Sequence, residues 1–537
     1  MTPPPAMMPA SMERPTFNAL LQGLPVLGRT GDGSVRVTTI VTDSRRVIPG
    51  ALFFALPGLR ANGHAFLDDV IARGAAAIIS GEPVAGLPAV AAAQVADPRR
   101  MLAEVARRFY GHPEEALRLV GVTGTNGKTT VSTLLRHLLQ DDGSQWGLVG
   151  TVRYHLGRRS IPSYKTTPDS ADLAAFFRQM ADAGCAGACL EVSSHALHQD
   201  RVHGFRFEVA AFTNLTRDHI DYHGDMSAYL AAKAALFDGR NGELPGVAVL
   251  NVDDPHGRAL AEACRLRGPT LTFGLSPDAD LRATDLALDT AGAVFTVRWQ
   301  GRSQRFTSRL TGDYNVANVL CALTMAAALG RDPLALAAAV AAFPGVAGRM
   351  ERVEAGQPFP VFIDYAHTDD ALRNVLGMLR RITPGRVLCV FGCGGDRDRG
   401  KRPAMTRAVA DLAQLAWATA DNPRKEGLES IFADMRGDLG PLPGLEFVPD
   451  RREAIGRALA AARGSWDLAQ FDRASSGRTR ALRKAGFPGL VQVGIVEDEE
   501  RRVPAQLHRE ALDRVGRVAH QQPPHARAAR KRDLAHA

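Results

Sequence analysis

The stretch from Gly121 to Thr130, Gly-Val-Thr-Gly-Thr-Asn-Gly-Lys-Thr-Thr, constrains the fold of this chain more than any other part of the sequence. Apolar Leu119 and Val120 precede it, and a helical pattern from Val131 to Leu139 follows. Glycines let the main chain approach phosphates, and free N–H groups at the start of a helix face the bound anion. The sequence therefore predicts a strand, a phosphate-binding loop and a helix, at a site that hydrolyses a nucleotide or transfers a group from it.

Within this loop, Lys128 is expected to reach the terminal phosphates and the hydroxyl of Thr129 to bind Mg²⁺. The common spacing has glycine where this chain has Val122, so the segment from Gly124 to Thr129 carries the pattern. The alternative is a glycine-rich turn that only caps a helix. We prefer the phosphate loop because the loop, the lysine, the hydroxyl and both flanking elements agree.

Length and composition limit the classes of protein that this chain can belong to. Its 537 residues are too many for one core and favour three domains. The net charge of +8 comes without a basic stripe interleaved with aromatics, which argues against nucleic-acid binding. Six cysteines without a C-x-x-C pair, no signal-peptide pattern and no apolar stretch of about 18 residues predict a cytoplasmic protein with reduced thiols.

Alternating strand and helix patterns predict an α/β protein with a small first domain, a central parallel-sheet domain and a third Rossmann-like domain. Strands are expected at 35–42, 51–55, 76–79, 187–191, 209–213, 247–251, 361–364 and 387–391, and helices at 65–73, 99–110 and 452–462. The expected parts are a disordered leader (1–15), the first domain (16–118), the central domain (119–347), the third domain (348–465) and an atypical tail (466–537).

Glu191 follows an apolar strand close in sequence to the phosphate loop, a usual place for a second Mg²⁺ ligand. Five nearby histidines raise the alternative of zinc: His195, His198, His203, His219 and His223. We favour an oxygen-ligated metal, because the phosphate loop calls for one and no H-E-x-x-H pattern occurs.

In the third domain, polar loops follow the strands and carry arginines. These loops are Asp364–His367, Gly392–Lys401 and Asp421–Glu426. A single loop arginine is more often structural, but beside a nucleotide site the planar guanidinium suits a substrate with carboxylates.

Taken together, the motifs resemble the Mur ligase family. GTNGKTT, EVSSHAL, TNLTRDHIDYHG, AAKAALF, GDYNVANVLCAL, GRMERV, DYAHT, FGCGGDRDRGKRP and DNPRKE occur in the family's order over residues 38 to 460. The resemblance implies a UDP-binding domain, a central ATPase domain and a C-terminal domain that closes on them. It also implies a cytoplasmic, monomeric, Mg²⁺-dependent ligase of peptidoglycan synthesis, in which ATP activates a carboxylate as an acyl phosphate and an amine attacks it. The DNPR tetrapeptide is similar to that of members joining meso-diaminopimelate to a UDP-MurNAc-dipeptide.

The resemblance also implies roles for individual residues. ATP would contact Gly124, Thr125, Asn126, Gly127, Lys128, Thr129, Thr130, Asn315, Asn318, Arg349 and Asp364. The UDP-substrate would contact Thr42, Ser44, Thr166, Thr167, Ser193, Gln199 and Arg201, with Thr42 and Ser44 near the Arg60–Asn62 loop. The amino acid would contact Arg397, Asp421, Asn422, Pro423 and Arg424. Catalysis would use Lys128, Glu191, His219 and Lys233, and metal would be held by Thr129, Glu191, His219 and Lys233. Lys233 would be carbamylated (N6-carboxylysine); the alternative is an ordinary surface lysine.

The end of the chain departs from the family. Gly-Lys-Gly-His-Glu should follow the helix at 452–462, but it is absent from Ser465 onward. We expect a replaced or out-of-frame, poorly ordered end; the alternative is divergence, with another carboxylate taking the lost role. Smaller departures are Asp369, where proline is usual, and Gly427, where an acidic residue is usual.

Two other functions stay open at this point. One is a related ligase that uses another amino acid or glutamylates folate, although Ser44 and the DNPR loop argue against folate. The other is a nucleotide- and UDP-sugar-binding protein whose ligase activity is impaired by the altered end.

Overall fold

A computed structural model describes residues 13–58, 62–83, 90–140, 142–353, 359–383, 385–396 and 398–462, and the backbone of 490–494. The chain divides into two compact units, Met1–Val346 and Ala347–Ala537. The expected boundary at 118/119 lies inside the first unit, and the domain bounds stay predictions. Most of the expected leader, Arg60, Arg397 and nearly all of the tail lie outside the described residues.

The first unit begins with a five-stranded sheet in the order β1-β5-β4-β3-β2, parallel except for β1. Its elements are α1 (Phe17–Leu21), β1 (Gly28–Thr30), β2 (Thr39–Val41), β3 (Ala51–Ala55), α2 (Leu67–Ala72), β4 (Ala77–Ser80), β5 (Ala91–Gln94) and α3 (Pro98–Phe109), with 3₁₀ turns η1 (Ser44–Arg46), η2 (Gly63–Phe66) and η3 (Pro113–Ala116). The strand expected at 35–42 is confined to β2, because the N–H groups of Val37 and Thr38 donate to Pro15 and Gly50 outside the ladder. Helix α3 begins where the Asp97 side chain accepts two N–H bonds and Pro98 occupies the first position.

An eleven-stranded sheet forms the rest of the first unit, in the order β16-β15-β14-β13-β12-β11-β6-β10-β7-β8-β9. Its strands are β6 (Arg118–Thr123), β7 (Trp146–Val149), β8 (Arg153–His155), β9 (Ser160–Pro162), β10 (Gly187–Glu191), β11 (Val209–Phe212), β12 (Val247–Asn251), β13 (Thr270–Gly274), β14 (Leu281–Asp289), β15 (Gly292–Trp299) and β16 (Arg302–Ser308). Its helices are α4 (Lys128–Leu139), α5 (Ser170–Asp182), α6 (Ser194–His198), α7 (Ile220–His223), α8 (Met226–Ala234), α9 (Pro255–Arg265), α10 (Asp313–Ala328) and α11 (Ala337–Ala342), with the 3₁₀ turn η4 (Pro333–Leu336).

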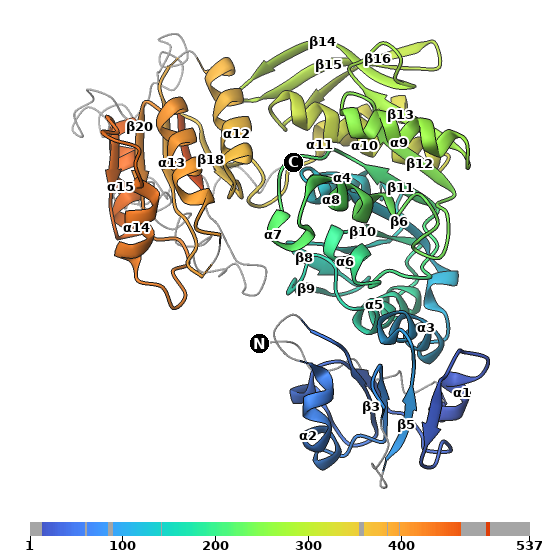
Figure 1. Cartoon of the computed structure of the whole chain (residues 1–537). Coiled ribbons are helices and arrows are strands. Elements are labelled where there is room, and N and C mark those ends of the chain that lie inside the picture. The colour runs from blue at the N-terminus through green and yellow to red at the C-terminus, as the bar shows by residue number, and fades with distance from the viewer. Residues whose placement is uncertain are drawn as a thin grey trace, which may run out of the picture. The chain divides into compact units, whose positions relative to one another are not determined.

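Strands β7, β10, β6, β11, β12 and β13 run parallel, so their carboxyl ends meet at one edge of the sheet. Separate hydrophobic clusters cover the two faces: one includes α5, the other α4 and α10 (Figure 1). A strand covered on both faces has a continuous apolar sequence, which is why β6, β10, β11 and β12 were expected; β7 and β13 were not predicted. Position 121, inside β6, requires glycine, because a Cβ there would come within 2.9 Å of the Phe207 ring.

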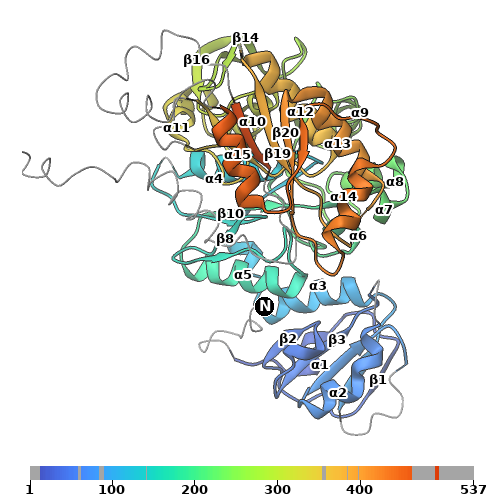
Figure 2. The ribbon, with the colours of Figure 1, turned by 90° about the vertical axis from the view of Figure 1, so that its left-hand side faces the viewer.

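The second unit contains a six-stranded sheet in the order β17-β18-β22-β19-β20-β21. Its elements are β17 (Glu351–Val353), β18 (Val361–Asp364), α12 (Asp369–Ile382), β19 (Val387–Phe391), α13 (Lys401–Leu412), β20 (Leu415–Ala418), α14 (Leu428–Arg436), β21 (Leu445–Phe447), α15 (Arg451–Ala462) and β22 (Leu490–Gly494). Helix α15 covers one face, and α12 and α13 lie on the other (Figure 2). The structure confirms the expected α/β fold with three sheets, of which the middle one is parallel in its central part.

Strand β22 comes from the part of the chain that we expect to be poorly ordered. It pairs in parallel with both β18 and β19, with Gly494 beside Asp364. The structure describes these five residues as a strand, while the expected poor order of the tail stays a prediction. Without them β18 and β19 would each present unpaired backbone groups in the middle of a sheet.

Among the described residues, no helix is long and apolar enough to cross a membrane. The six cysteines are free and buried, in line with the expected reduced thiols.

Candidate active site

The phosphate loop joins β6 to α4 at the centre of the carboxyl edge of the large sheet. Two of its glycines have positive φ, 144° at Gly124 and 91° at Gly127. A Cβ at these positions would collide with Thr213 and with the Asn318 side chain, respectively. Only glycine fits both positions, so the backbone path of the loop depends on these two residues.

The segment that follows β11 fixes this loop. Asn126 N donates to Asn214 Oδ1 at 2.9 Å, and Thr213 Oγ1 donates to Asn126 O at 2.6 Å. Thr125 N also donates to the Asn214 carbonyl at 2.9 Å. Because β11 pairs in parallel with β6, both loops leave the sheet at the same edge.

Two lysine amines converge on one carbonyl of the loop. Lys128 Nζ donates to Gly124 O and to Thr125 O, each at 2.9 Å. Lys233 Nζ, from α8, donates to the same Gly124 O at 2.7 Å. Lys128 beside a helix N-terminus favours a polyphosphate at this point.

Lys233 is buried, with 1% of its surface exposed, which excludes the alternative of an ordinary surface lysine. Burial, and then the nearby charge of Lys128, hold its pKa well below the usual range, while Asp218 opposes this. Its Nζ lies 4.6 Å from the centroid of the Tyr229 ring, one helical turn earlier on α8. A neutral, nucleophilic amine is the form that reacts with CO₂, so the surroundings suit carbamylation.

Glu191 ends β10 with 1% of its surface exposed, and hydroxyl and N–H donors surround it. Its Oε2 accepts bonds from Thr129 Oγ1 and Thr151 Oγ1, both at 2.9 Å, and its Oε1 accepts from Thr151 N at 2.8 Å. A Cβ at Gly150 would collide with this carboxylate, so glycine allows the approach. A carboxylate and a hydroxyl within hydrogen-bond distance are hard oxygen ligands and fit Mg²⁺.

His219 lies in a group of aromatic rings at the start of α7, with a positive φ of 53°. Its ring centroid is 4.7 Å from that of His195 and 6.2 Å from that of Tyr229. Burial, reinforced by neighbouring histidines, lowers the pKa of His195 to about 3 and that of His223 to about 4, so both are neutral at pH 7.

The zinc alternative requires ligand atoms that converge. Over the described ranges, the set of three ligand atoms within 4.8 Å of one another belongs to His112, Glu114 and Glu115. None of the five histidines that raised the zinc alternative belongs to it. Glu114 is already paired with Arg107 at 2.5 Å, which makes a structural role sufficient for that group.

The residues expected to hold the muramoyl-dipeptide end lie together, next to Glu191. Thr167 Oγ1 donates to the Glu191 carbonyl at 2.7 Å and to Ser193 Oγ at 3.3 Å. Arg201 donates to Thr167 O and to Gln199 Oε1, both at 2.8 Å. Thr166 Oγ1 lies 3.1 Å from Thr151 Oγ1. The structure therefore brings this set together, while the binding role of each member stays a prediction.

Thr42 and Ser44 lie elsewhere, where β2 ends and η1 begins in the small sheet. Two residues after Ser44, Arg46 pairs with Asp172 of α5 at 3.3 Å, and both side chains are nearly buried. Tyr164 Oη donates to the same carboxylate at 2.5 Å. This contact ties the expected uridine end to the segment that carries Thr166 and Thr167.

The other residues expected at ATP are divided between the units. On α10, Asn318 Nδ2 donates to Asn315 Oδ1 at 3.0 Å, and Asn318 faces Gly127 of the loop. In the second unit, Asp364 is buried, which raises its pKa, and it accepts N–H bonds from Met350 and Ala366, both at 2.8 Å. Arg349 lies over the Tyr365 ring, 4.7 Å from its centroid.

The described residues expected at the amino acid follow β20, beside the loop that follows β19. The side chain of Asp421 is 3% exposed, and its Oδ1 accepts a bond from Arg451 at 3.2 Å. Burial raises the pKa of Asp421 to about 6, against the opposing charge of Arg451. Arg424 has a positive φ of 52° and donates to Gly395 O at 2.6 Å. Arg397 lies outside the described residues.

Several residues of the site were not predicted from the sequence: Thr151, Thr213, Asn214, Asp218 and Tyr229. Tyr229 could have been found, because it lies four positions before Lys233 on one helical face. Thr213 and Asn214 directly follow an apolar strand, which is also a usable signal. Thr151 offers no such signal, since its contact with Glu191 depends on the pairing of β7 with β10.

Three family models match the chain: Mur ligase family, catalytic domain (residues 36–110), Mur ligase middle domain (122–326), and Mur ligase, glutamate ligase domain (348–468). These matches fall on the three sheets in chain order. They take in the phosphate loop, Glu191, Lys233 and the loops of the second unit.

Two relatives named UDP-N-acetylmuramoyl-L-alanyl-D-glutamate--2,6-diaminopimelate ligase align over most of the chain. The protein of Solibacter usitatus is 46% identical over 80% of this chain and 86% of its own length. That of Geobacillus kaustophilus is 41% identical over 82% of this chain and 91% of its own length. A solved structure with the same name has a TM-score of 0.63 at 30% identity, covering 95% of this chain and 100% of that chain. The chain therefore belongs to the Mur ligase family.

Proposed function

We propose that this chain is an ATP-dependent ligase that joins meso-2,6-diaminopimelate to UDP-N-acetylmuramoyl-L-alanyl-D-glutamate. The observation that carries the proposal is the continuous set of contacts from Glu191 through Thr129 to the phosphate loop, and from Gly124 O to Lys128 and Lys233. Relatives that carry this name at 40–46% identity support the choice of substrates.

The reaction has two chemical steps. A carboxylate of the dipeptide attacks the terminal phosphorus of ATP, and ADP leaves while an acyl phosphate forms. The amine of the second substrate then attacks the acyl carbon, and phosphate leaves from the tetrahedral intermediate as an amide forms and a proton is released. Such transfers depend mainly on alignment and on neutralisation of charge.

The residues of the first unit supply both requirements. Lys128 stabilises charge that develops on the transferred phosphoryl group. Thr129 and Glu191 would hold Mg²⁺, with His219 and carbamylated Lys233 at a second metal; bound metal neutralises phosphate oxygens. Thr166, Thr167, Ser193, Gln199 and Arg201 would orient the dipeptide, because they adjoin the Glu191 strand end.

For the amine substrate, the proposal rests on the loop from Asp421 to Arg424. A guanidinium can bind the second carboxylate of diaminopimelate with two parallel hydrogen bonds, whereas it would repel the ammonium group of lysine. The Asp421 carboxylate suits an ammonium group. A monomeric, cytoplasmic enzyme is part of the same proposal.

A second candidate is a protein that binds ATP and the UDP-sugar but does not ligate. The observation that favours it is the absence of Gly-Lys-Gly-His-Glu after α15. This candidate keeps the first unit functional and lacks a complete amine site.

Phosphate release by the purified chain tests both candidates. ATP, Mg²⁺ and the UDP-dipeptide are supplied with meso-diaminopimelate, L-lysine or no amine, and Lys128→Ala serves as the inactive control. Release with diaminopimelate only, accompanied by the UDP-tripeptide product, supports the ligase. ATP and UDP-dipeptide binding without turnover supports the second candidate. Turnover with lysine but not diaminopimelate would refute the proposed amine.

A further inference from the structure

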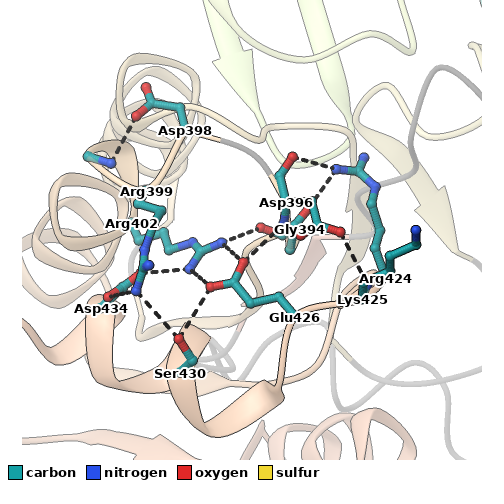
Figure 3. A network of polar contacts seen from close by, with 12 residues as sticks. Gly394, Asp396, Asp398, Arg399, Arg402, Arg424, Lys425, Glu426, Ser430 and Asp434 are labelled. Atoms are coloured by element: carbon teal, nitrogen blue, oxygen red, sulfur yellow. Dashed lines mark hydrogen bonds and ion pairs between the residues drawn. The ribbon is translucent and has the colours of Figure 1, made fainter. Parts of the chain in front are cut away.

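Arg402, the second residue of α13, is a fully buried arginine outside the residues expected to touch a substrate. Its side chain is 0% exposed. It donates to Glu426 Oε1 and Oε2 at 2.8 and 2.6 Å, and to Asp434 Oδ2 at 2.7 Å. It also donates to the Gly394 carbonyl at 3.1 Å. Figure 3 shows the guanidinium between the two carboxylates.

Glu426 links Arg402 to the loop that follows β19, because it bonds both. Its Oε2 accepts from Asp396 N at 3.0 Å, and its Oε1 accepts from Ser430 Oγ at 3.3 Å. The pKa of Glu426 falls to about 2, chiefly through its bonds to Arg402, so it is ionised over the whole working range. Glu426 is two residues after Arg424 in the chain, which limits how far Arg424 can move.

The two loops are joined at several further points. Gly395 N donates to Asn422 O at 2.8 Å, and Lys425 N donates to Asp396 Oδ2 at 3.2 Å. Arg424 donates to Gly395 O at 2.6 Å. A Cβ at Gly395 would collide with the Pro423 carbonyl, so the backbones are in close contact.

The backbone at Arg424 needs such support. Its φ of 52° lies in the left-handed region, which a residue other than glycine rarely adopts. A conformation of this kind persists only where the surroundings fix it. Glu426, two residues further along the chain, is held by the fully buried Arg402.

We propose that Arg402 is a positioning residue for the amine substrate, acting through Glu426 to fix Arg424 and its loop. This inference rests on the proposed function, because it takes the Asp421–Arg424 loop to bind the amino acid. Arg402 itself touches no substrate in this proposal. Its effect is on amine affinity, and the ATP and UDP-dipeptide sites of the first unit are unaffected.

The geometry requires an arginine. Its planar fork reaches both oxygens of Glu426, one oxygen of Asp434 and a backbone carbonyl at once. A lysine has the same charge but a single ammonium centre, which cannot make a bidentate pair and meet the other two acceptors. Arg402→Lys therefore keeps the positive charge and removes the bidentate hydrogen bonding.

The test compares Arg402→Lys and Glu426→Gln with wild type. In each, the KM for meso-diaminopimelate, ATP and the UDP-dipeptide and kcat are measured, with diaminopimelate affinity also measured by calorimetry. We expect the KM and Kd for diaminopimelate to rise at least tenfold, and the other two KM values to stay within twofold. The double variant should be little worse than either single variant, because both break one contact.

Arg399→Lys is the matched control. Arg399 bonds the same Asp434 carboxylate, at 2.7 and 2.9 Å, and Ser430 Oγ at 3.4 Å, but its side chain is 62% exposed and it makes no hydrogen bond to Glu426. We expect no change in amine affinity. Equal loss in this control and in Arg402→Lys would overturn the inference.

Three further outcomes have distinct meanings. Unchanged diaminopimelate affinity in folded Arg402→Lys overturns the inference and leaves the proposed function intact. A lowered melting temperature with all three KM values raised alike also overturns it, because it indicates a structural role only. Failure of wild type to bind diaminopimelate refutes the proposed function and, with it, this inference.

Discussion

The phosphate-loop region of the first unit and the Asp421–Glu426 region of the second unit are held in place by different physical means. Around the phosphate loop, backbone carbonyls, hydroxyl groups and buried Glu191 and Lys233 form the contacts. Around the Asp421–Glu426 loop, charged side chains bond one another, with Arg402 between two carboxylates.

The difference predicts how each region responds to substitution. The first region takes its shape from parallel strand ends and glycine positions, so its charged side chains remain available for chemistry. In the second, an ion pair contributes little net stability, but removal of one partner leaves a buried charge uncompensated. We expect substitutions in the first region to reduce kcat and those in the second to weaken amine binding.

The largest expected effect comes from Lys128→Ala. Loss of one preorganised positive donor at the transferred phosphoryl group should lower kcat by about 100-fold to 1,000-fold. Steady-state phosphate release measures this. Lys425→Ala, at an exposed lysine of the second region, is the control and should stay near wild type. A decrease of kcat by less than fivefold in Lys128→Ala would contradict the proposed difference between the regions.

Lys233→Met should lower kcat by about tenfold to a hundredfold, because the variant cannot form the carbamate proposed to bind metal. A short carboxylate such as acetate or formate should restore part of the activity of Lys233→Ala, where space is left for it. Depletion of CO₂ should slow wild type and leave Lys233→Met unchanged. Mass spectrometry of intact protein under CO₂ adds a second readout. Indifference of wild type to CO₂, with no rescue, would argue against carbamylation.

Amine binding in the second unit should depend on pH, whereas ATP binding should not. The pKa of Asp421 is raised to about 6, so its carboxyl group loses its charge as pH falls through 6. The KM for diaminopimelate should then rise about tenfold per pH unit below that point, while the KM for ATP stays level. Asp421→Asn should show weak amine binding without this dependence. A flat KM between pH 7 and 5 in wild type would contradict the assignment.

The raised pKa of Asp421 also makes the stability of the folded protein depend on pH. Since its pKa rises from 3.8 to about 6 on folding, the folded state binds the proton more tightly across this window. Its contribution to stability is present below pH 3.8 and is lost as pH rises through 6. The melting temperature of wild type relative to Asp421→Asn should therefore fall as pH rises from 4 to 7.

The smallest expected effect is Gly377→Ala in α12. A Cβ there meets no atom within 4 Å, so the variant should stabilise the helix by about 0.5–1 kcal/mol. Hydrogen exchange of α12 amides measures it. Gly121→Ala in β6 is the opposite case, because its Cβ would approach Phe207 to 2.9 Å and should destabilise by about 1–3 kcal/mol. Equal shifts in both variants would contradict the packing difference.

Much of the fold followed from local sequence. Strands 187–191, 247–251, 361–364 and 387–391 were predicted to the residue, because strands buried on both faces are continuous apolar runs bounded by turn residues. Strand β22 was not predicted, although Pro488 and Gly489 precede it, because its segment lies in the tail that departs from the family pattern. Its place between β18 and β19 depends on partners more than 90 residues away.

By itself, the sequence determined the phosphate loop, the order of the motifs and the strand ends that carry Glu191 and Asp364. These are local properties: glycine positions, apolar runs and polar residues at fixed spacing. Only the tertiary structure decided that Lys233 is buried beside Gly124 O, that Thr151 reaches Glu191 and that Arg402 anchors Glu426. Burial and hydrogen bonding between distant segments depend on how strands pair and helices pack, and no residue's own chemistry specifies its neighbours in space.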